Sequence, residues 1–323
     1  MDIANKKAIT KIVTTNKIEK KNNFWKVFKS QRTLYMMSLP FVVLVFVFNY
    51  LPVWGWTMAF QNYKPGRSFF EQEWIGFDHF ITLFTDERFL MVLRNTLAMS
   101  LMGLVVGFTV PIIFAVLINE VRHSFFKRTV QTVTYLPHFV SWVVVAGIVT
   151  KMLSVDGGIV NDLLLGLGII DKPFQFMAQG TWFWGIITVS DLWKEMGWNA
   201  IIFLAAIAGL DPQLYEAAKV DGAGRLRRIW HVTLPGIRPT ILVVLILNIG
   251  HLVSIGFEKQ MLLGNSLVLD YSEVLDLYAL NYGIGLGQFS YGTAIGIFNS
   301  VVSIILLFLA NGVFKRFSNQ SVM

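Results

Sequence analysis

The sequence predicts an all-α, polytopic membrane protein with six transmembrane helices and both termini in the cytoplasm. Three observations support this prediction. Hydrophobic residues make up 54% of the 323 residues and charged residues only 15%, which is outside the usual range of soluble domains. Six segments stay apolar over the roughly 20 residues that a helix needs to cross a bilayer. Lys and Arg are concentrated in alternate connections between these segments.

The apolar segments define a transmembrane domain over residues 34–315, between a basic tail (1–33) and a short C-terminal tail (316–323). They lie at 34–60, 94–119, 132–153, 182–210, 237–259 and 292–314. The third segment has the weakest start, because Pro137 and His138 interrupt its apolar pattern.

The distribution of basic residues predicts the orientation. One side would hold 19 Lys and Arg, against 6 on the other side. The richer side comprises the basic tail, 120–131, 211–236 with Arg238, and the C-terminal end. Basic loops remain in the cytoplasm, so both termini are expected there. A basic tail can also bind nucleic acid, but beside a membrane span it more often fixes topology, and we expect no nucleic-acid partner.

On the opposite side, residues 74–93 have Phe77, Phe80, Ile81 and Phe84 at helical spacing. This pattern predicts an amphipathic helix at the membrane interface. A rim that contacts an external partner is the alternative, and the two interpretations are compatible.

The connection 211–236 contains clear helix signals. Asp211 suits an N-cap and Pro212 a first helical position, which predicts a helix as far as Val220. Isolated helices below ~12–15 residues are marginal in water, so this one must pack on something. Its partner is either another protein or, for an amphipathic connector, the lipid headgroups.

A second short helix is expected after this one. Gly222 and Gly224 break the first helix. Residues 225–232 would form the second helix, and Pro235 would end it because it disfavours helix at Leu234.

A spaced motif runs through the same connection. It consists of Glu216-Ala217-Ala218, three residues ending in Asp221, Gly222, nine residues, Val232, one residue and Leu234-Pro235. This spacing resembles the EAA loop of permease subunits from binding-protein-dependent ABC importers. The motif also lies between the fourth and fifth spans, as in six-helix members of that family, in which isoleucine is commoner than Val232.

Residues 30–315 are similar to the family members that carry oligosaccharides and polysaccharide fragments, relatives of the maltose permease. The similarity rests on the long basic tail, Trp74-Ile75-Gly76-Phe77, Asn95-Thr96-Leu97, Leu136-Pro137, Gly157-Gly158-Ile159-Val160-Asn161 and Trp193-Lys194-Glu195-Met196-Gly197-Trp198-Asn199.

The resemblance implies the ABC type I importer permease fold in a bacterial cytoplasmic membrane. The helix of Glu216, Ala217 and Ala218 would sit in a cleft of a separate ATPase subunit, and Asp221, Gly222, Leu234 and Pro235 would belong to the same coupling loop. An external solute-binding protein and a second, different permease are the other implied partners. This chain lacks a Gly-x4-Gly-Lys-Ser/Thr loop. We therefore expect it to bind no cofactor, with ATP and Mg used by the partner ATPase.

The fourth span carries Asp191, Lys194 and Glu195. If the helix enters the bilayer near Trp182, these residues lie roughly 14–20 Å deep. Each charge at that depth costs ~2.5–3.5 kcal/mol, so the three groups need partners. The spacing allows Asp191 and Lys194 to pair. The cluster is either a structural salt bridge or the polar lining of a substrate path.

Further polar side chains extend this candidate path. Trp198 offers a stacking face and Asn199 an amide, and the fifth span adds Asn248 and His251. His251 alone is more often a helix–helix hydrogen-bonding residue. The sequence contains no cysteine, and we predict no catalytic set and no metal site in it.

Two other classes of function remain open from the residues. An ion-coupled secondary transporter would use Asp191, Lys194 and Glu195, although the ordered connection 211–236 argues against it. A membrane enzyme would need an exposed acid/base pair near the end of a span, and no pair has convincing spacing.

Overall fold

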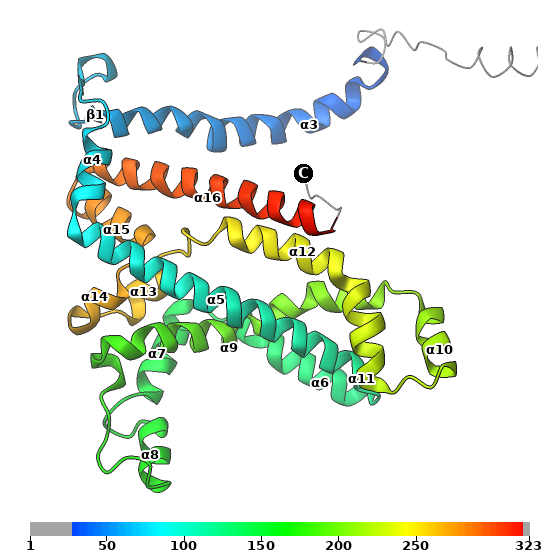
Figure 1. The fold of residues 1–323 in the computed structure, drawn as a ribbon. Helices are drawn as coiled ribbons and strands as arrows, with labels where there is room; N and C mark the ends of the chain where they lie inside the picture. The colour runs from blue at the N-terminus through cyan, green and yellow to red at the C-terminus, as the bar shows by residue number, and fades with distance from the viewer. Residues whose placement is uncertain (1–27, 319–323) are drawn as a thin grey trace, which may run out of the picture. The chain divides into compact units, whose positions relative to one another are not determined.

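The computed structural model describes residues 28–318 (Figure 1). The predictions for most of the basic tail and for residues 319–323 lie outside this part. The described chain is mainly helical and has one small sheet, in which β1 (Gln61–Asn62) pairs antiparallel with β2 (Glu73–Trp74). It forms two compact units, one up to Trp56 and one from Thr57 onwards.

The described part of the first unit is a mainly apolar helix. It begins with α3 (Arg32–Val45) and continues as the π-helical η1 (Phe46–Tyr50) into the 3-10 helix η2 (Leu51–Phe60). No residue of α3 is buried. Such a helix is suited to contact with lipid or another protein. The first predicted span is therefore confirmed as a helix over Arg32–Phe60.

The second unit is built on long apolar helices. They are α5 (Glu87–Glu120), α9 (Gly180–Ala208), α12 (Leu234–Gly250) and α16 (Phe289–Ser318). Helix α5 lies along α9, and α12 lies along α16 (Figure 1). In the described part, four helices are long and apolar enough to cross a membrane, or six if each of two bent helix pairs counts as one span. The prediction of six spans agrees with the second count.

The third predicted span, 132–153, is not a straight helix. Helix α6 (Ser124–Tyr135) ends in the 3-10 turn η4 (Leu136–Phe139), and α7 (Trp142–Met152) leaves it at 104°. The break follows Pro137, whose nitrogen cannot donate a helical hydrogen bond.

The fifth predicted span, 237–259, is displaced. A continuous helix runs from Arg225 to Gly250 through α11 (Arg225–Arg228), η6 (Ile229–Thr233) and α12. The prediction that Pro235 ends a separate helix is therefore wrong. The wide π-helical turn η6 precedes Pro235, and a π turn moves the carbonyl that the proline ring would otherwise meet. His251 has left the helix, with φ −99° and ψ 9°.

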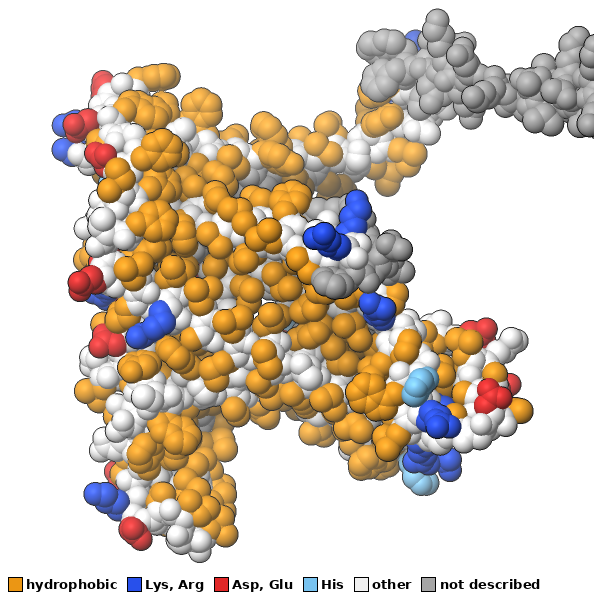
Figure 2. All heavy atoms as spheres, viewed as in Figure 1, with side chains coloured by type: hydrophobic (Ala, Val, Ile, Leu, Met, Phe, Trp, Pro, Cys, Tyr) orange, Lys and Arg blue, Asp and Glu red, His pale blue; other side chains and the backbone are white. Residues whose placement is uncertain are grey.

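Several of the shorter helices lie at the two ends of the second unit (Figure 1). Helices α4 (Asp78–Thr85), α8 (Ile159–Gly166), α14 (Leu269–Ser272) and α15 (Leu275–Leu280) lie at one end, and α10 (Pro212–Val220), α11 and the end of α16 at the other. Apolar side chains cover the middle of α5, α12 and α16, and charged side chains gather at the ends (Figure 2). The remaining elements are η3 (Phe69–Glu71), η5 (Phe176–Ala178), α13 (Glu258–Leu263), η7 (Ser266–Val268) and η8 (Asn281–Gly285).

The amphipathic helix expected over 74–93 is shorter than predicted. It forms only α4, because Asp86 adopts an extended conformation and caps α5 by accepting a hydrogen bond from the Arg88 N–H. The predicted pattern of apolar residues continues into α5, where Phe89 and Val92 are buried.

Helix α9 comes close to α6 at Gly197. A Cβ at this position would clash with the Thr134 carbonyl and lie 2.9 Å from a ring carbon of Tyr135. At Gly185, also in α9, an added Cβ would have no heavy atom of a neighbouring element within 4 Å. Glycine at 197 therefore sets the distance between the broken third span and α9.

We expect Gly197→Ala to destabilise the protein by about 1–3 kcal/mol, because the extra methyl group forces the helices apart. The matched control, Gly185→Ala, should be neutral or stabilising by up to about 1 kcal/mol, since alanine is the better helix former. The thermal unfolding temperature of the purified protein measures both effects. Equal temperatures for the two variants would contradict the close approach.

Candidate functional site

A cavity of about 590 Å³ lies among α5, α9, α12 and the turn that follows α12. Its polar side chains are Ser100, Thr188, Asp191, Trp198, Asn199, Asn248, His251, Ser254 and Lys259. The volume is typical of pockets for small organic ligands. Five of the predicted path residues line it, namely Asp191, Trp198, Asn199, Asn248 and His251. Lys194 and Glu195 do not belong to the lining.

The ion pair in the cavity wall differs from the predicted one. The Lys259 Nζ lies 3.0 Å from an oxygen of Asp191. The predicted pair of Asp191 with Lys194 is wrong, because Lys194 points toward the broken third span. Sequence reasoning missed Lys259, since it lies in a connection 68 residues from Asp191 and no local spacing relates the two.

Lys194 and Glu195 instead stabilise the break in the third span. The Lys194 Nζ donates to the His138 carbonyl at 2.6 Å and lies 3.0 Å from an oxygen of Glu195. The other Glu195 oxygen lies 2.7 Å from Nδ1 of His138. The helix ends just after His138, so its carbonyl has lost its usual helical donor. The buried ammonium group replaces that donor.

This ion cluster also orients a cavity residue. The His138 ring stacks on Trp198 with centroids 4.2 Å apart and planes 1° apart. His138 covers one face of the indole, so Trp198 can offer only its other face and its edges to the cavity. Lys194 and Glu195 thus act on the cavity indirectly, through His138.

Trp142, the first residue of α7, lies between the two ion pairs. The Lys194 and Lys259 ammonium groups lie 5.9 Å and 5.8 Å from its ring centroid, within the range of cation–π attraction. One aromatic ring therefore contacts both the Asp191–Lys259 pair and the Lys194–Glu195 pair.

The turn that closes the cavity is held by residues of α5, α15 and α16. The Gly256 N–H donates to Asp276 at 2.7 Å, and the Asn299 amide donates to its other oxygen at 3.3 Å. Ser100 Oγ donates to the Leu252 carbonyl. Burial raises the pKa of the Asp276 carboxyl, while the hydrogen bonds from Gly256 and Asn299 oppose the rise.

The second candidate site is α10, which has the bounds that the sequence predicts. Asp211 caps it by accepting from the Gln213 N–H at 2.9 Å, and Asp221 is its C-cap. Gly222 adopts φ +74°, which favours glycine. The helix is anchored by the Tyr215 hydroxyl, which lies 3.0 Å from Thr233 Oγ1 in η6.

Most of the surface of α10 is uncovered in this chain. Glu216 and Ala217 are exposed and Ala218 is partly buried. Leu214 is 52% and Val220 88% exposed, so the helix also presents apolar area. The two motif residues Leu234 and Pro235 do not share this surface, because they lie in α12, where Leu234 packs on a core cluster.

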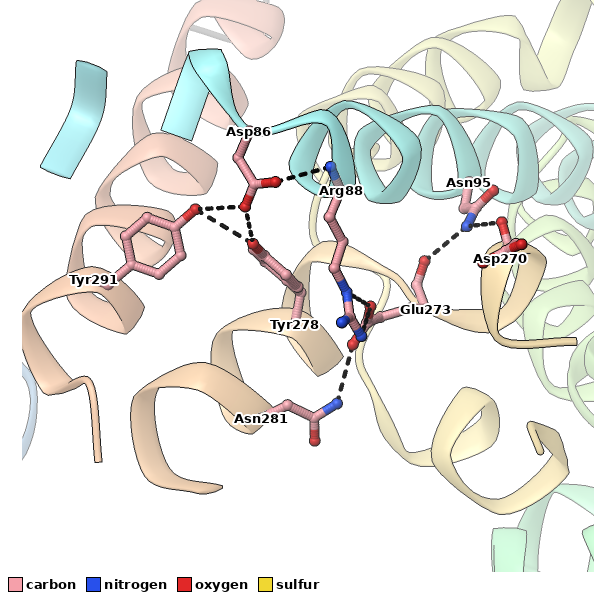
Figure 3. A network of polar contacts seen from close by, with 8 residues as sticks. All are labelled: Asp86, Arg88, Asn95, Asp270, Glu273, Tyr278, Asn281 and Tyr291. Atoms are coloured by element: carbon pink, nitrogen blue, oxygen red, sulfur yellow. Dashed lines mark hydrogen bonds and ion pairs between the residues drawn. The ribbon is translucent and has the colours of Figure 1, made fainter. Parts of the chain in front are cut away.

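A separate network of polar contacts fixes the connection 264–281 to the start of α5 (Figure 3). Arg88 contacts a buried Glu273 oxygen through Nε at 3.0 Å and through a terminal nitrogen at 2.9 Å. Asn281 donates to the other Glu273 oxygen at 3.1 Å. The Asn95 amide donates to the carbonyls of Asp270 and Glu273 at 2.9 and 3.0 Å. Sequence reasoning missed this network, because its members are far apart in the chain.

Comparisons with known proteins place these sites in context. The sequence model of a family described as "Binding-protein-dependent transport system inner membrane component" matches residues 107–319. The chain is 45% identical over 292 residues to the polygalacturonan/rhamnogalacturonan transport system permease protein YteP of Bacillus subtilis (strain 168), and the match covers 90% of each protein. Protein LplB of the same organism is 44% identical and is covered to 92%.

Solved structures show the same fold. A bacterial ABC transporter involved in the import of the acidic polysaccharide alginate contains a chain that is 40% identical, with a TM-score of 0.84. The match covers 92% of this chain and all of that one. The bacterial alginate ABC transporter in complex with a pentasaccharide-bound periplasmic protein gives a TM-score of 0.85.

We expect Lys259→Met to destabilise the protein by about 1–2 kcal/mol, because it leaves the Asp191 carboxylate without its cation in a partly solvated wall. The double variant Asp191→Asn/Lys259→Met should recover most of this loss. Lys151→Met is the control, because Lys151 is exposed and forms no ion pair in the described part of the chain. Additive losses in thermal unfolding experiments would show that the pair is not coupled.

Proposed function

The chain belongs to the family of binding-protein-dependent transport system inner membrane components, and we propose that it carries an oligosaccharide or a polysaccharide fragment into a bacterial cell. It is a multi-pass membrane permease subunit of an ABC importer and not an enzyme. The relatives give no support to an ion-coupled secondary transporter. The Asp191, Lys194 and Glu195 groups have structural partners instead.

The cargo that the relatives favour is a sugar oligomer containing uronic acids. YteP is named for polygalacturonan and rhamnogalacturonan, and the matching transporter imports the acidic polysaccharide alginate. The cavity is compatible with such a cargo. The Asp191 carboxylate in its wall is held by Lys259, while Asn199 and Asn248 can bond sugar hydroxyls.

The observation that carries the proposal is the supported indole of Trp198 in a wall of amide and charged groups. A pyranose ring has apolar C–H faces and polar edges, so it needs an aromatic face together with hydrogen-bonding groups. A stacking partner works best when its orientation is fixed before binding, because less conformational freedom is then lost. The stacked His138, held by Glu195, supplies this fixation.

The exposed helix α10 is the proposed contact with a separate ATPase subunit. Its nine residues cannot form a stable helix alone, and its surface with Glu216, Ala217 and Val220 is open. A basic residue of the ATPase would pair with Glu216. In this proposal ATP and Mg are bound by that subunit, and this chain binds no cofactor.

A continuous series of contacts links α10 to the cavity. The hydrogen bond between Tyr215 and Thr233 joins α10 to η6, and η6 is continuous with α12. Helix α12 brings Asn248 to the cavity wall. Movement of α10 by the ATPase would therefore tilt a helix that lines the proposed sugar path, which is what alternating access requires.

The remaining partners follow from the family. We propose a second, different permease subunit and an external solute-binding protein that delivers the sugar. We also propose that both termini are cytoplasmic and that the membrane is the bacterial cytoplasmic membrane. The support is that α10 and the end of α16 lie at one end of the second unit, together with most of its basic connections (Figures 1 and 2).

We expect Glu216→Arg to lower uptake of labelled trigalacturonate by about tenfold or more, since it replaces a charge-assisted bond by repulsion. The test uses cells in which the wild-type gene restores uptake. The control is Asp162→Arg, which makes the same charge change on the exposed surface of α8 at the other end of the unit. Both variants should reach the membrane in normal amounts.

Unchanged uptake by the Glu216→Arg variant would contradict the coupling role of α10. Failure of the wild-type gene to restore uptake of any uronic-acid or neutral oligosaccharide would contradict the proposed cargo class.

A further inference from the structure

A second polar pocket, of about 430 Å³, lies at the end of the unit that carries α4 and α15. Residues from β1, α4, η8 and the start of α16 line it, together with the cap residue of α5. It shares no lining residue with the cavity among α5, α9 and α12. The pocket is therefore a separate site from that cavity.

Aromatic rings form much of its wall. Tyr63 meets Phe289 edge-on with centroids 6.2 Å apart, and Tyr282 lies 5.7 Å from Tyr291. Tyr282 is also 4.3 Å from Tyr278, and the Arg88 guanidinium lies 5.7 Å from its ring centroid. These contacts on several sides hold the ring of Tyr282 in place.

Asp86 fixes the base of this wall (Figure 3). One of its oxygens accepts from the Arg88 N–H at 2.9 Å. The other accepts from the hydroxyls of Tyr278 at 2.7 Å and Tyr291 at 3.4 Å. Burial raises the pKa of Tyr278, so its hydroxyl stays protonated and keeps donating. The carboxylate is committed to protein donors, and the pocket is not built to bind a cation.

Other polar groups of the wall have no short hydrogen bond within the described part of the chain. The Gln288 side chain and the Tyr282 hydroxyl form no hydrogen bond there, and Gln288 is exposed. The Asn62 amide makes only a long contact of 3.4 Å with Glu73. An amide and a hydroxyl beside fixed aromatic rings match the apolar faces and polar edges of a sugar.

We propose that this pocket binds one sugar unit of the transported oligomer at the outer face, before the oligomer reaches the cavity. The sugar ring packs on Tyr282 and Phe289, and its hydroxyls bond Gln288 and Asn62. No Lys or Arg of the described residues lines the pocket, so it recognises the ring and its hydroxyls, not a carboxylate. The inference rests on the proposed function for the identity of the sugar and for the outer location.

The test measures binding of trigalacturonate to the complete importer in lipid nanodiscs without its solute-binding protein, by saturation-transfer-difference NMR. We expect Gln288→Ala and Tyr282→Phe each to weaken binding about tenfold, the effect of losing one hydrogen bond to a site that stays polar. Neither change removes a packed ring. Ile284→Ala is the matched control, because Ile284 lies exposed in η8 outside the lining. Asn248→Ala in the main cavity should leave this signal in place.

Two results would overturn the proposal. One is the absence of saturation transfer with the wild-type importer. The other is wild-type affinity in both pocket variants, including the case in which they weaken docking of the solute-binding protein instead. Failure of the proposed function would be seen in a different experiment, the uptake measurement. Cells without this chain would then still take up trigalacturonate.

Discussion

The structure depends on the need to satisfy three ionisable groups in the middle of α9. Asp191, Lys194 and Glu195 would each cost ~2.5–3.5 kcal/mol without partners in a bilayer. Their partners come from other elements: Lys259 from α13, and His138 from the break between α6 and α7. The same contacts explain why the third span can break inside the membrane, because the Lys194 ammonium group satisfies the carbonyl that the break releases.

The three charged residues of α9 are neighbours in the sequence, but these contacts give them two different roles. Asp191 and Lys259 face the cavity, whereas Lys194 and Glu195 act from behind it and hold His138 against Trp198. The cavity thus obtains a fixed aromatic face and a nearly neutral wall. Helix α12 closes the other side and continues, through η6, to the anchor of α10. One continuous helix therefore connects the surface proposed for the ATPase with the groups proposed for the sugar.

Features set by local sequence could be predicted, and features set by distant contacts could not. The bounds of α10 follow from Asp211, Pro212 and Gly222, which act on neighbouring backbone. The apolar spans follow from composition. In contrast, Lys259 comes to Asp191 only through the turn after Gly250, and the tyrosine pocket joins residues more than 200 positions apart. Proline rules failed at Pro235 because the preceding π turn removed the clash on which those rules rest.

The most direct measurement concerns access to the cavity. The chain has no cysteine, so Asn248→Cys would be its only thiol. In the complete importer, we expect a membrane-impermeant thiol reagent to label this position at a rate that changes with ATP and falls when a transported oligosaccharide is present. Ile305→Cys, exposed on α16 and outside the cavity, should show neither effect. Labelling of Asn248→Cys that ignores both ATP and sugar would contradict the assignment of this cavity to the transport path.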